Sequence, residues 1–150
     1  MSSMLKIFMT ITIGIMLTNL PVLGADLTSY RWKSRLLLVF SPTDSNPGFA
    51  AFDQNVSREL PAVKDRDLIV FRVFEKGPSR MDEHPLSSED SQKLRRHFKV
   101  GPGRFTVILV GKDGGVKMVR EHRAELQEIF DLIDSMPMRQ REMKEKGKTR

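Results

Sequence analysis

Two short apolar runs constrain the fold of this chain more than any other feature. The first covers residues 36–40 without interruption, and the second covers residues 68–74 with only Arg72 inside it. Apolar runs of this length without alternation are typical of strands that are buried on both faces. Such strands belong to sheets with helices on each side, so we expect an α/β domain.

Helical signals follow the first run. Asn46 can cap a helix and Pro47 can take its first position, where a missing N–H costs nothing. Apolar residues then recur at helical spacing up to Pro61: Phe49, Phe52, Val56 and Leu60. After the second run, polar residues 75–86 contain Gly77 and two prolines and are expected to form a surface loop. A second helix is predicted to begin after Ser87.

The last third of the chain predicts a β-hairpin followed by a helix. Residues 105–110 read as a strand, residues 111–115 as a glycine-rich turn, and residues 116–119 as the returning antiparallel strand. A helix ending at Pro137 is indicated by four apolar residues: Leu126, Ile129, Phe130 and Ile133. The order β-α-β-α-β-β-α predicts a thioredoxin-like domain at residues 26–138, with a four-stranded mixed sheet, helices on both faces and a right-handed first crossover.

The chain contains no cysteine. Residues 45–48, Ser-Asn-Pro-Gly, fall where the thioredoxin family, which this order resembles, carries Cys-Gly-Pro-Cys. The family's cis-proline position falls near Phe105, whereas the nearest proline here is Pro102. Dithiol exchange needs a thiolate, so the sequence excludes a dithiol oxidoreductase, and it also excludes Cys-ligated zinc and iron–sulfur clusters.

The first 25 residues predict an export signal. Lys6 precedes an uncharged stretch at residues 7–20, which at about 1.5 Å per residue spans roughly 21 Å, less than the ~30 Å of a bilayer core. Pro21 and small residues follow, and we expect cleavage after Ala25, with Gly24 as the neighbouring alternative. The expected location is therefore periplasmic or secreted; an uncleaved anchor is the alternative.

The formal charge of +6 is concentrated at the carboxyl end. Residues 139–150 contain two acidic residues, Glu142 and Glu145, against six basic ones: Arg139, Arg141, Lys144, Lys146, Lys148 and Arg150. We expect a solvated, disordered tail. Attraction to anionic lipid, cell-wall polymer or glycan is the alternative, and it includes peripheral membrane contact. No interleaving of arginines with aromatic residues suggests nucleic-acid binding.

Three segments together resemble a secreted domain of unknown function that has been called the P-DUDES domain. They are residues 30–40, residues 110–117 (VGKDGGVK) and residues 131–139 (DLIDSMPMR). The family occurs in small bacterial exported proteins and in vertebrate sushi-repeat and coiled-coil matrix proteins. The resemblance implies a thioredoxin-like fold and a binding or structural role for an unknown protein or an anionic envelope or matrix component.

Eight residues are candidates for binding. Tyr30, Arg31 and Trp32 bring the only tyrosine and the only tryptophan of the chain next to an arginine. Packing across the sheet edge is the favoured explanation; a recognition edge is the alternative, because these residue types concentrate binding energy at interfaces. The other five belong to the resembling segments or follow them directly: Lys112, Asp113, Lys117, Arg139 and Arg141.

Catalysis is the weaker hypothesis. Ser45 lies at the predicted amino end of a helix and would need a histidine base, but no spacing places His84, His97 or His122 beside it. No metal-ligand pattern links the histidines, and we expect neither metal nor cofactor. The sequence thus favours an exported, redox-inactive binding or structural module. A hydrolase or peroxidase-related enzyme acting through the Ser45 loop is the alternative.

Overall fold

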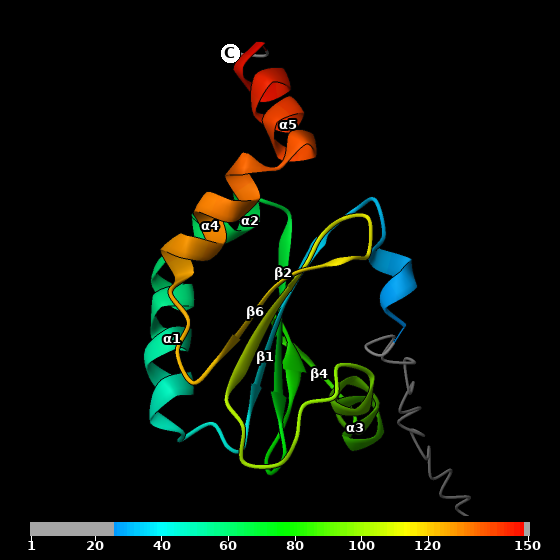
Figure 1. The fold of residues 1–150 in the computed structure, drawn as a ribbon, viewed down its shortest axis with the longest axis vertical. Coiled ribbons are helices and arrows are strands. Elements are labelled where there is room, and N and C mark those ends of the chain that lie inside the picture. The colour runs from blue at the N-terminus through cyan, green and yellow to red at the C-terminus, as the bar shows by residue number, and fades with distance from the viewer. Residues whose placement is uncertain (1–25, 149–150) are drawn as a thin grey trace, which may run out of the picture.

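The two apolar runs form the central strands of a mixed sheet (Figure 1). A computed structural model describes residues 26–148, so the predicted signal segment lies outside the described residues. Strand β1 (Arg35–Ser41) pairs in parallel with β2 (Leu68–Phe74), and Leu37 lies opposite Val70. Every residue of β1 is buried, as the unbroken apolar run predicts.

Six strands make up the sheet, two more than expected. Their order is β4-β3-β2-β1-β5-β6, with β3 at Arg80–Met81, β4 at His84–Pro85, β5 at Thr106–Val110 and β6 at Val116–Glu121. The expectation of four strands is therefore corrected. The two extra strands lie in the segment predicted as a surface loop, and at two residues each they are too short to produce an apolar pattern.

Helices cover both faces of the sheet. Figure 1 shows α1 (Pro47–Arg58) and α4 (Leu126–Ser135) on one side and α3 (Ser88–His97) on the other. Asn46 caps α1 as predicted, because its Oδ1 accepts hydrogen bonds from the N–H groups of Gly48 and Phe49. Pro61 does not end the helical segment; it lies in the first turn of a second short helix, α2 (Leu60–Asp65).

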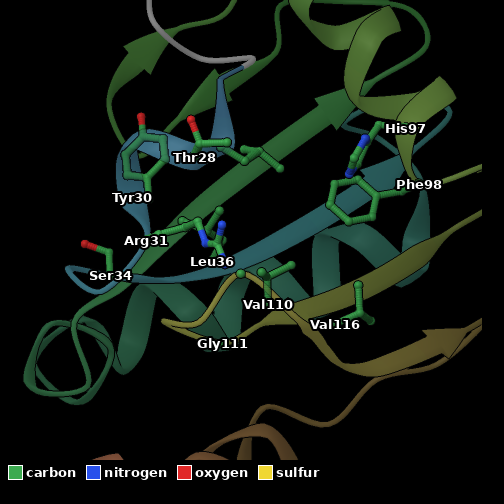
Figure 2. Close-up of a pocket in the computed structure, with 12 residues that line it drawn as sticks. Thr28, Tyr30, Arg31, Ser34, Leu36, His97, Phe98, Val110, Gly111 and Val116 are labelled. Atoms are coloured by element: carbon green, nitrogen blue, oxygen red, sulfur yellow. The ribbon is translucent and has the colours of Figure 1, made fainter.

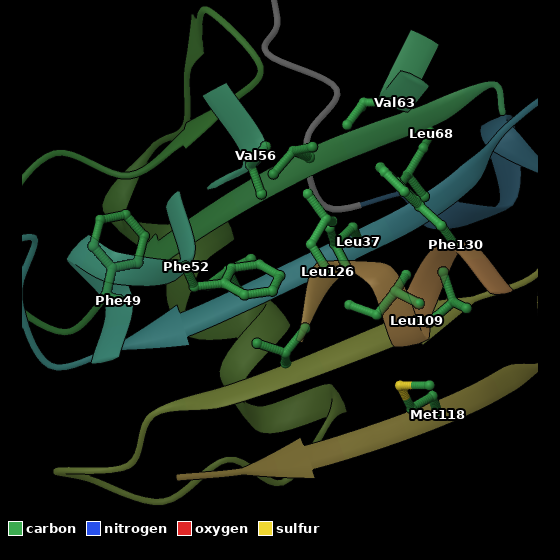
Figure 3. Close-up of a cluster of buried hydrophobic side chains, with 14 of the residues drawn as sticks. Leu37, Phe49, Phe52, Val56, Val63, Leu68, Leu109, Met118, Leu126 and Phe130 are labelled. Carbon is green, nitrogen blue, oxygen red and sulfur yellow. The ribbon is translucent and has the colours of Figure 1, made fainter. Parts of the chain in front are cut away.

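The central strands send alternate side chains into two apolar layers. One layer contains Leu37 with residues of α1 and α4 (Figure 3), where the rings of Phe49 and Phe74 meet edge to face at 4.8 Å. The other contains Leu36 and Phe40 with α3 and the 3₁₀ helix η1 (Leu27–Tyr30). Each fully buried side chain of this size stabilises the fold by about 1.5–3 kcal/mol.

The carboxyl end is helical. Pro137 ends α4, because Met136 before it is extended, but it also begins α5 (Pro137–Lys148). This finding corrects the expectation of a disordered tail from residue 139. Contacts between α5 and the rest of the domain, made by residues far apart in the sequence, hold this helix in place. None of the helices within residues 26–148 is long and apolar enough to cross a membrane.

Candidate functional site

Residues 45–48, which by resemblance correspond to the thioredoxin redox motif, lie in the loop after β1 and at the start of α1. The Ser45 hydroxyl lies 3.0 Å from the hydroxyl of Thr43, and within residues 26–148 no hydrogen bond joins it to a histidine. A Cβ added at Gly48 would lie 3.3 Å from the ring of Phe105. The described peptide bonds are all trans, so the cis-proline that thioredoxins carry before the third strand has no counterpart here.

The candidate binding residues gather at the opposite end of the sheet. There the loop after η1 lies against the β5–β6 turn (Figure 1). The Trp32 N–H donates to the Lys112 carbonyl at 2.6 Å, and Arg31 Nε donates to the Asp113 carbonyl at 3.2 Å. Gly114 in this turn has a φ of +85°, and an added Cβ would lie 3.0 Å from Arg31 Nε. Glycine at this position allows the two loops to approach.

Five of the eight candidates line one cleft of about 300 Å³, here called the Trp32 cleft. Its walls are formed by Trp32, Arg35, Gly111, Lys112, Asp113, Lys117, Met136, Pro137, Met138 and Arg141. Trp32 is 64% exposed and has a φ of +66°, a left-handed conformation that costs an L-residue roughly 1–2 kcal/mol. Residues with strained backbone conformations cluster at active sites and ligand-binding sites, so Trp32 is a candidate functional residue.

The other three candidates lie outside this cleft. Arg139 is only 3% exposed, and it donates hydrogen bonds to Asp65 and Asp134. It therefore holds α5 to the domain. The Tyr30 hydroxyl donates to the sulfur of Met81 at 2.8 Å, and burial raises the pKa of Tyr30. Tyr30 and Arg31 line a separate groove on the α3 side of the sheet (Figure 2).

An ion-pair network beneath the Trp32 cleft joins α5 to the sheet. Its centre is Arg35, which is 1% exposed and donates from both Nη atoms to the Glu142 carboxylate, at 3.1 and 3.2 Å. Lys112 Nζ lies 2.8 Å from the same carboxylate and 2.7 Å from Asp67. Sequence reasoning missed this network, because its partners lie far apart in the chain. The one available signal was an arginine directly before an apolar run.

The network holds its acidic members in the ionised form. Hydrogen bonds from Lys146 and Arg139 lower the pKa of Asp65 to about 2. Burial opposes ionisation of Glu142, but hydrogen bonds from Lys112 and Arg35 outweigh it and lower the pKa of this carboxyl. The charges on the inner face of α5 are therefore compensated at neutral pH.

The charged residues of α5 divide between two sides of the helix. At about 100° per residue, Arg139, Glu142 and Lys146 share the inner side of the helix and form the ion pairs. The opposite side carries a cationic ridge of Arg141, Lys144 and Lys148, all exposed. Within the part of the chain that the structure describes, no hydrogen bond or ion pair engages their charged groups. Arg141 belongs to both the ridge and the Trp32 cleft.

A family model described as Domain of unknown function (DUF4174) matches residues 26–142. The chain belongs to this family. A curated relative from Danio rerio, "Coiled-coil domain-containing protein 80", is 28% identical over an alignment of 133 residues that covers 78% of this chain. The match covers only 15% of that relative's length. The link to a vertebrate coiled-coil protein is thus confirmed, while the P-DUDES name and the sushi-repeat link stay predictions.

The fold is similar to that of peroxiredoxins. The reduced 2-Cys peroxiredoxin of Plasmodium vivax has a TM-score of 0.58 at 17% identity, covering 77% of this chain and 84% of that one. Thioredoxin peroxidase I of Plasmodium yoelii has a TM-score of 0.56 at 19% identity, covering 77% and 79%. At these identities the likeness concerns the fold alone. It confirms the predicted thioredoxin-like class of this DUF4174 domain.

Proposed function

We propose that this DUF4174 domain is a redox-inactive, thioredoxin-like binding module that works outside the cytoplasm. One observation supports the proposal: the chain has a thioredoxin-like fold but no cysteine, and by the resemblance to thioredoxin Ser45 and Gly48 fall where that family carries its redox cysteines. An exposed tryptophan and the cationic ridge of Arg141, Lys144 and Lys148 lie at the other end of the sheet. The domain has the fold of the family that it resembles but lacks the thiols that this family's redox chemistry requires.

The Trp32 cleft and the cationic ridge together fit an anionic partner. Tryptophan, methionine and arginine are enriched at protein interfaces, and the cleft contains all three. The ridge extends its positive charge along α5, and each Lys or Arg near an anionic surface contributes on the order of 1 kcal/mol. The partner is an anionic protein, an envelope or matrix polymer, or an anionic membrane surface.

Binding is tested with two probes of defined chemistry, heparin and vesicles containing phosphatidylglycerol. We expect the paired substitution K117E/R141E to weaken binding to at least one probe about tenfold or more, because it reverses two cleft charges. Leu60→Ala on α2 serves as a control, since Leu60 is 44% exposed and lies outside the cleft. Equal binding by the cleft variant and the native chain would contradict the proposed site. The two probes distinguish a polymer from a membrane.

Export is tested by identifying the amino-terminal residue of the protein recovered outside the cytoplasm. Cleavage after Ala25 leaves Asp26 as the first residue. Recovery of the folded protein in the cytosol with residues 1–25 still attached would contradict the proposed location.

The enzymatic alternative has a direct test. The purified chain is incubated with generic ester and peroxide substrates, and the proposal predicts no turnover. Reproducible activity that disappears in Ser45→Ala would replace the binding module with a hydrolase or peroxidase-related enzyme.

A further inference from the structure

The α3 side of the sheet has an uncovered apolar area on the edge strand β6. Helix α3 and η1 lie over the second apolar layer, which also contains the buried Ile108 and Val110 of β5. Val116 and Val119 of β6 remain 52% and 47% exposed, and they are two of four large apolar side chains exposed to this degree within residues 26–148. In an α/β domain this face is normally buried by another layer.

A β-bulge places both valines on this face. Residues three apart in a regular strand point to opposite sides of the sheet. Here Val116 pairs with Val110 and Met118 with Leu109, so the register shifts by one residue at Lys117. Val119 then pairs with Ile108 on the same face as Val116 and Val110. The bulge makes this apolar strip continuous along β6.

The strip forms the floor of a groove with two connected lobes, here called the acyl groove. The first lobe, about 300 Å³, lies between η1, the end of α3 and the β5–β6 strands (Figure 2). The second lobe, about 510 Å³, continues along the hairpin past Ile108 and Val119. Both lobes are lined by His97, Phe98 and Val116, which form a waist between them.

Positive charge lies at both ends of the acyl groove. Arg31 borders the first lobe. Lys99 and Arg104 border the second lobe, and within residues 26–148 no hydrogen bond or ion pair engages the Lys99 ammonium. Glu121 is the single carboxylate in the lining, and it lies 3.8 Å from Arg104 with both side chains more than half exposed. The second lobe can therefore accept an anionic head group.

We propose that the acyl groove binds a medium-chain fatty acid as its carboxylate. The head group lies at Lys99 and Arg104, and the chain passes over Val119, through the waist at Phe98, and into the first lobe beside Leu27. Charge complementarity favours this occupant over a second copy of the chain, since two such grooves face to face would bring like charges together. The inference is independent of the Trp32 cleft, which lies on the other side of the β5–β6 turn.

The test is an NMR titration of the purified full chain with sodium octanoate, decanoate and dodecanoate, each below its micelle concentration. We expect saturable amide shifts at Val116, Val119 and Ile108. The Kd should fall two- to fourfold for each added CH₂, because a fully buried CH₂ contributes about fourfold in affinity and the groove is partly open. Dodecyl trimethylammonium should bind at least tenfold more weakly, since its head group is positive.

Variants of the acyl groove separate binding from folding. V116S/V119S and the surface variant K99Q/R104Q should each weaken dodecanoate binding at least fivefold. L60S, which changes an exposed leucine elsewhere, and R58Q, an exposed arginine on α1, should leave it unchanged. The proposal is overturned by shifts that do not saturate, by an affinity independent of chain length, or by equal loss in L60S. Amide shifts in the groove that depend on protein concentration in the absence of ligand would also overturn it. They would show that a second copy of the chain occupies the groove.

Discussion

Trp32 combines the features expected of a binding residue with a conformation that does not favour folding. Its indole is mostly exposed, so it contributes little to the core, and its backbone is left-handed. The N–H of Trp32 donates to the Lys112 carbonyl and thereby holds the backbone in place. Contact with a binding partner best explains a mostly exposed residue whose backbone conformation destabilises the fold.

Trp32→Gly tests whether Trp32 is a binding residue. Glycine relieves a left-handed strain of about 1–2 kcal/mol and adds an unfolded-state entropy cost of about 0.5–1 kcal/mol. The free energy of unfolding, measured by thermal unfolding, should therefore rise by at most about 1.5 kcal/mol. Binding to heparin or to phosphatidylglycerol vesicles, whichever of the two the native chain binds, should weaken about tenfold or more, because the aromatic side chain that anchors the partner is lost. A large loss of stability with unchanged binding would assign Trp32 a structural role.

Helix α5 is held to the domain by ion pairs more than by apolar burial. Arg139 is its one buried residue, and Arg35 below it is fully enclosed. Removing one partner of a buried ion pair leaves an uncompensated charge, which costs far more than breaking a surface pair. The docking of α5 therefore depends on Glu142 in particular.

Glu142→Gln should destabilise the domain by about 2–4 kcal/mol in chemical denaturation, because Arg35 loses its carboxylate partner. Glu128→Gln is the matched control. Glu128 pairs with Arg120 where both side chains are more than 40% exposed, and its loss should cost at most about 1 kcal/mol. Similar effects of the two substitutions would show that the Arg35 pair does not hold α5.

Acid should release α5 before the core unfolds. Asp65 and Glu142 have lower pKa values in the folded state than in the unfolded chain, so their contribution is present at neutral pH and is lost as pH falls through the folded values. The window lies between about pH 4.5, near the unfolded glutamate value, and about pH 2, the folded pKa of Asp65. Amide hydrogen exchange measured across this window should rise in α5 first. Protection of α5 that is independent of pH would contradict this account.

The two ends of the sheet carry different sets of residues. The end that carries catalysis in thioredoxins has a capped helix and a serine without a histidine partner in the described chain. The other end carries the Trp32 cleft, the ion-pair network and the ridge. The proposed function assigns binding to this second end.

Local signals in the sequence predicted most of the fold. The apolar runs, the Asn46 cap and the glycine-rich turn at residues 111–115 depend on neighbouring residues, and the corresponding elements formed as expected. The order of α5 depends on the distant pair between Arg35 and Glu142, which no local pattern contains. The same limit explains why Arg139 was predicted as a binding residue although it is buried.

The most direct test of the binding module is the salt dependence of its affinity for heparin or phosphatidylglycerol vesicles, whichever of the two it binds. R141E/K144E/K148E reverses the ridge, and R58E/K76E/R96E makes the same change in net charge at exposed cations elsewhere. If the ridge binds the probe, the slope of log Kd against log salt should fall by about two to three in the first variant and stay unchanged in the second. Equal slopes in both variants would contradict a binding site on α5.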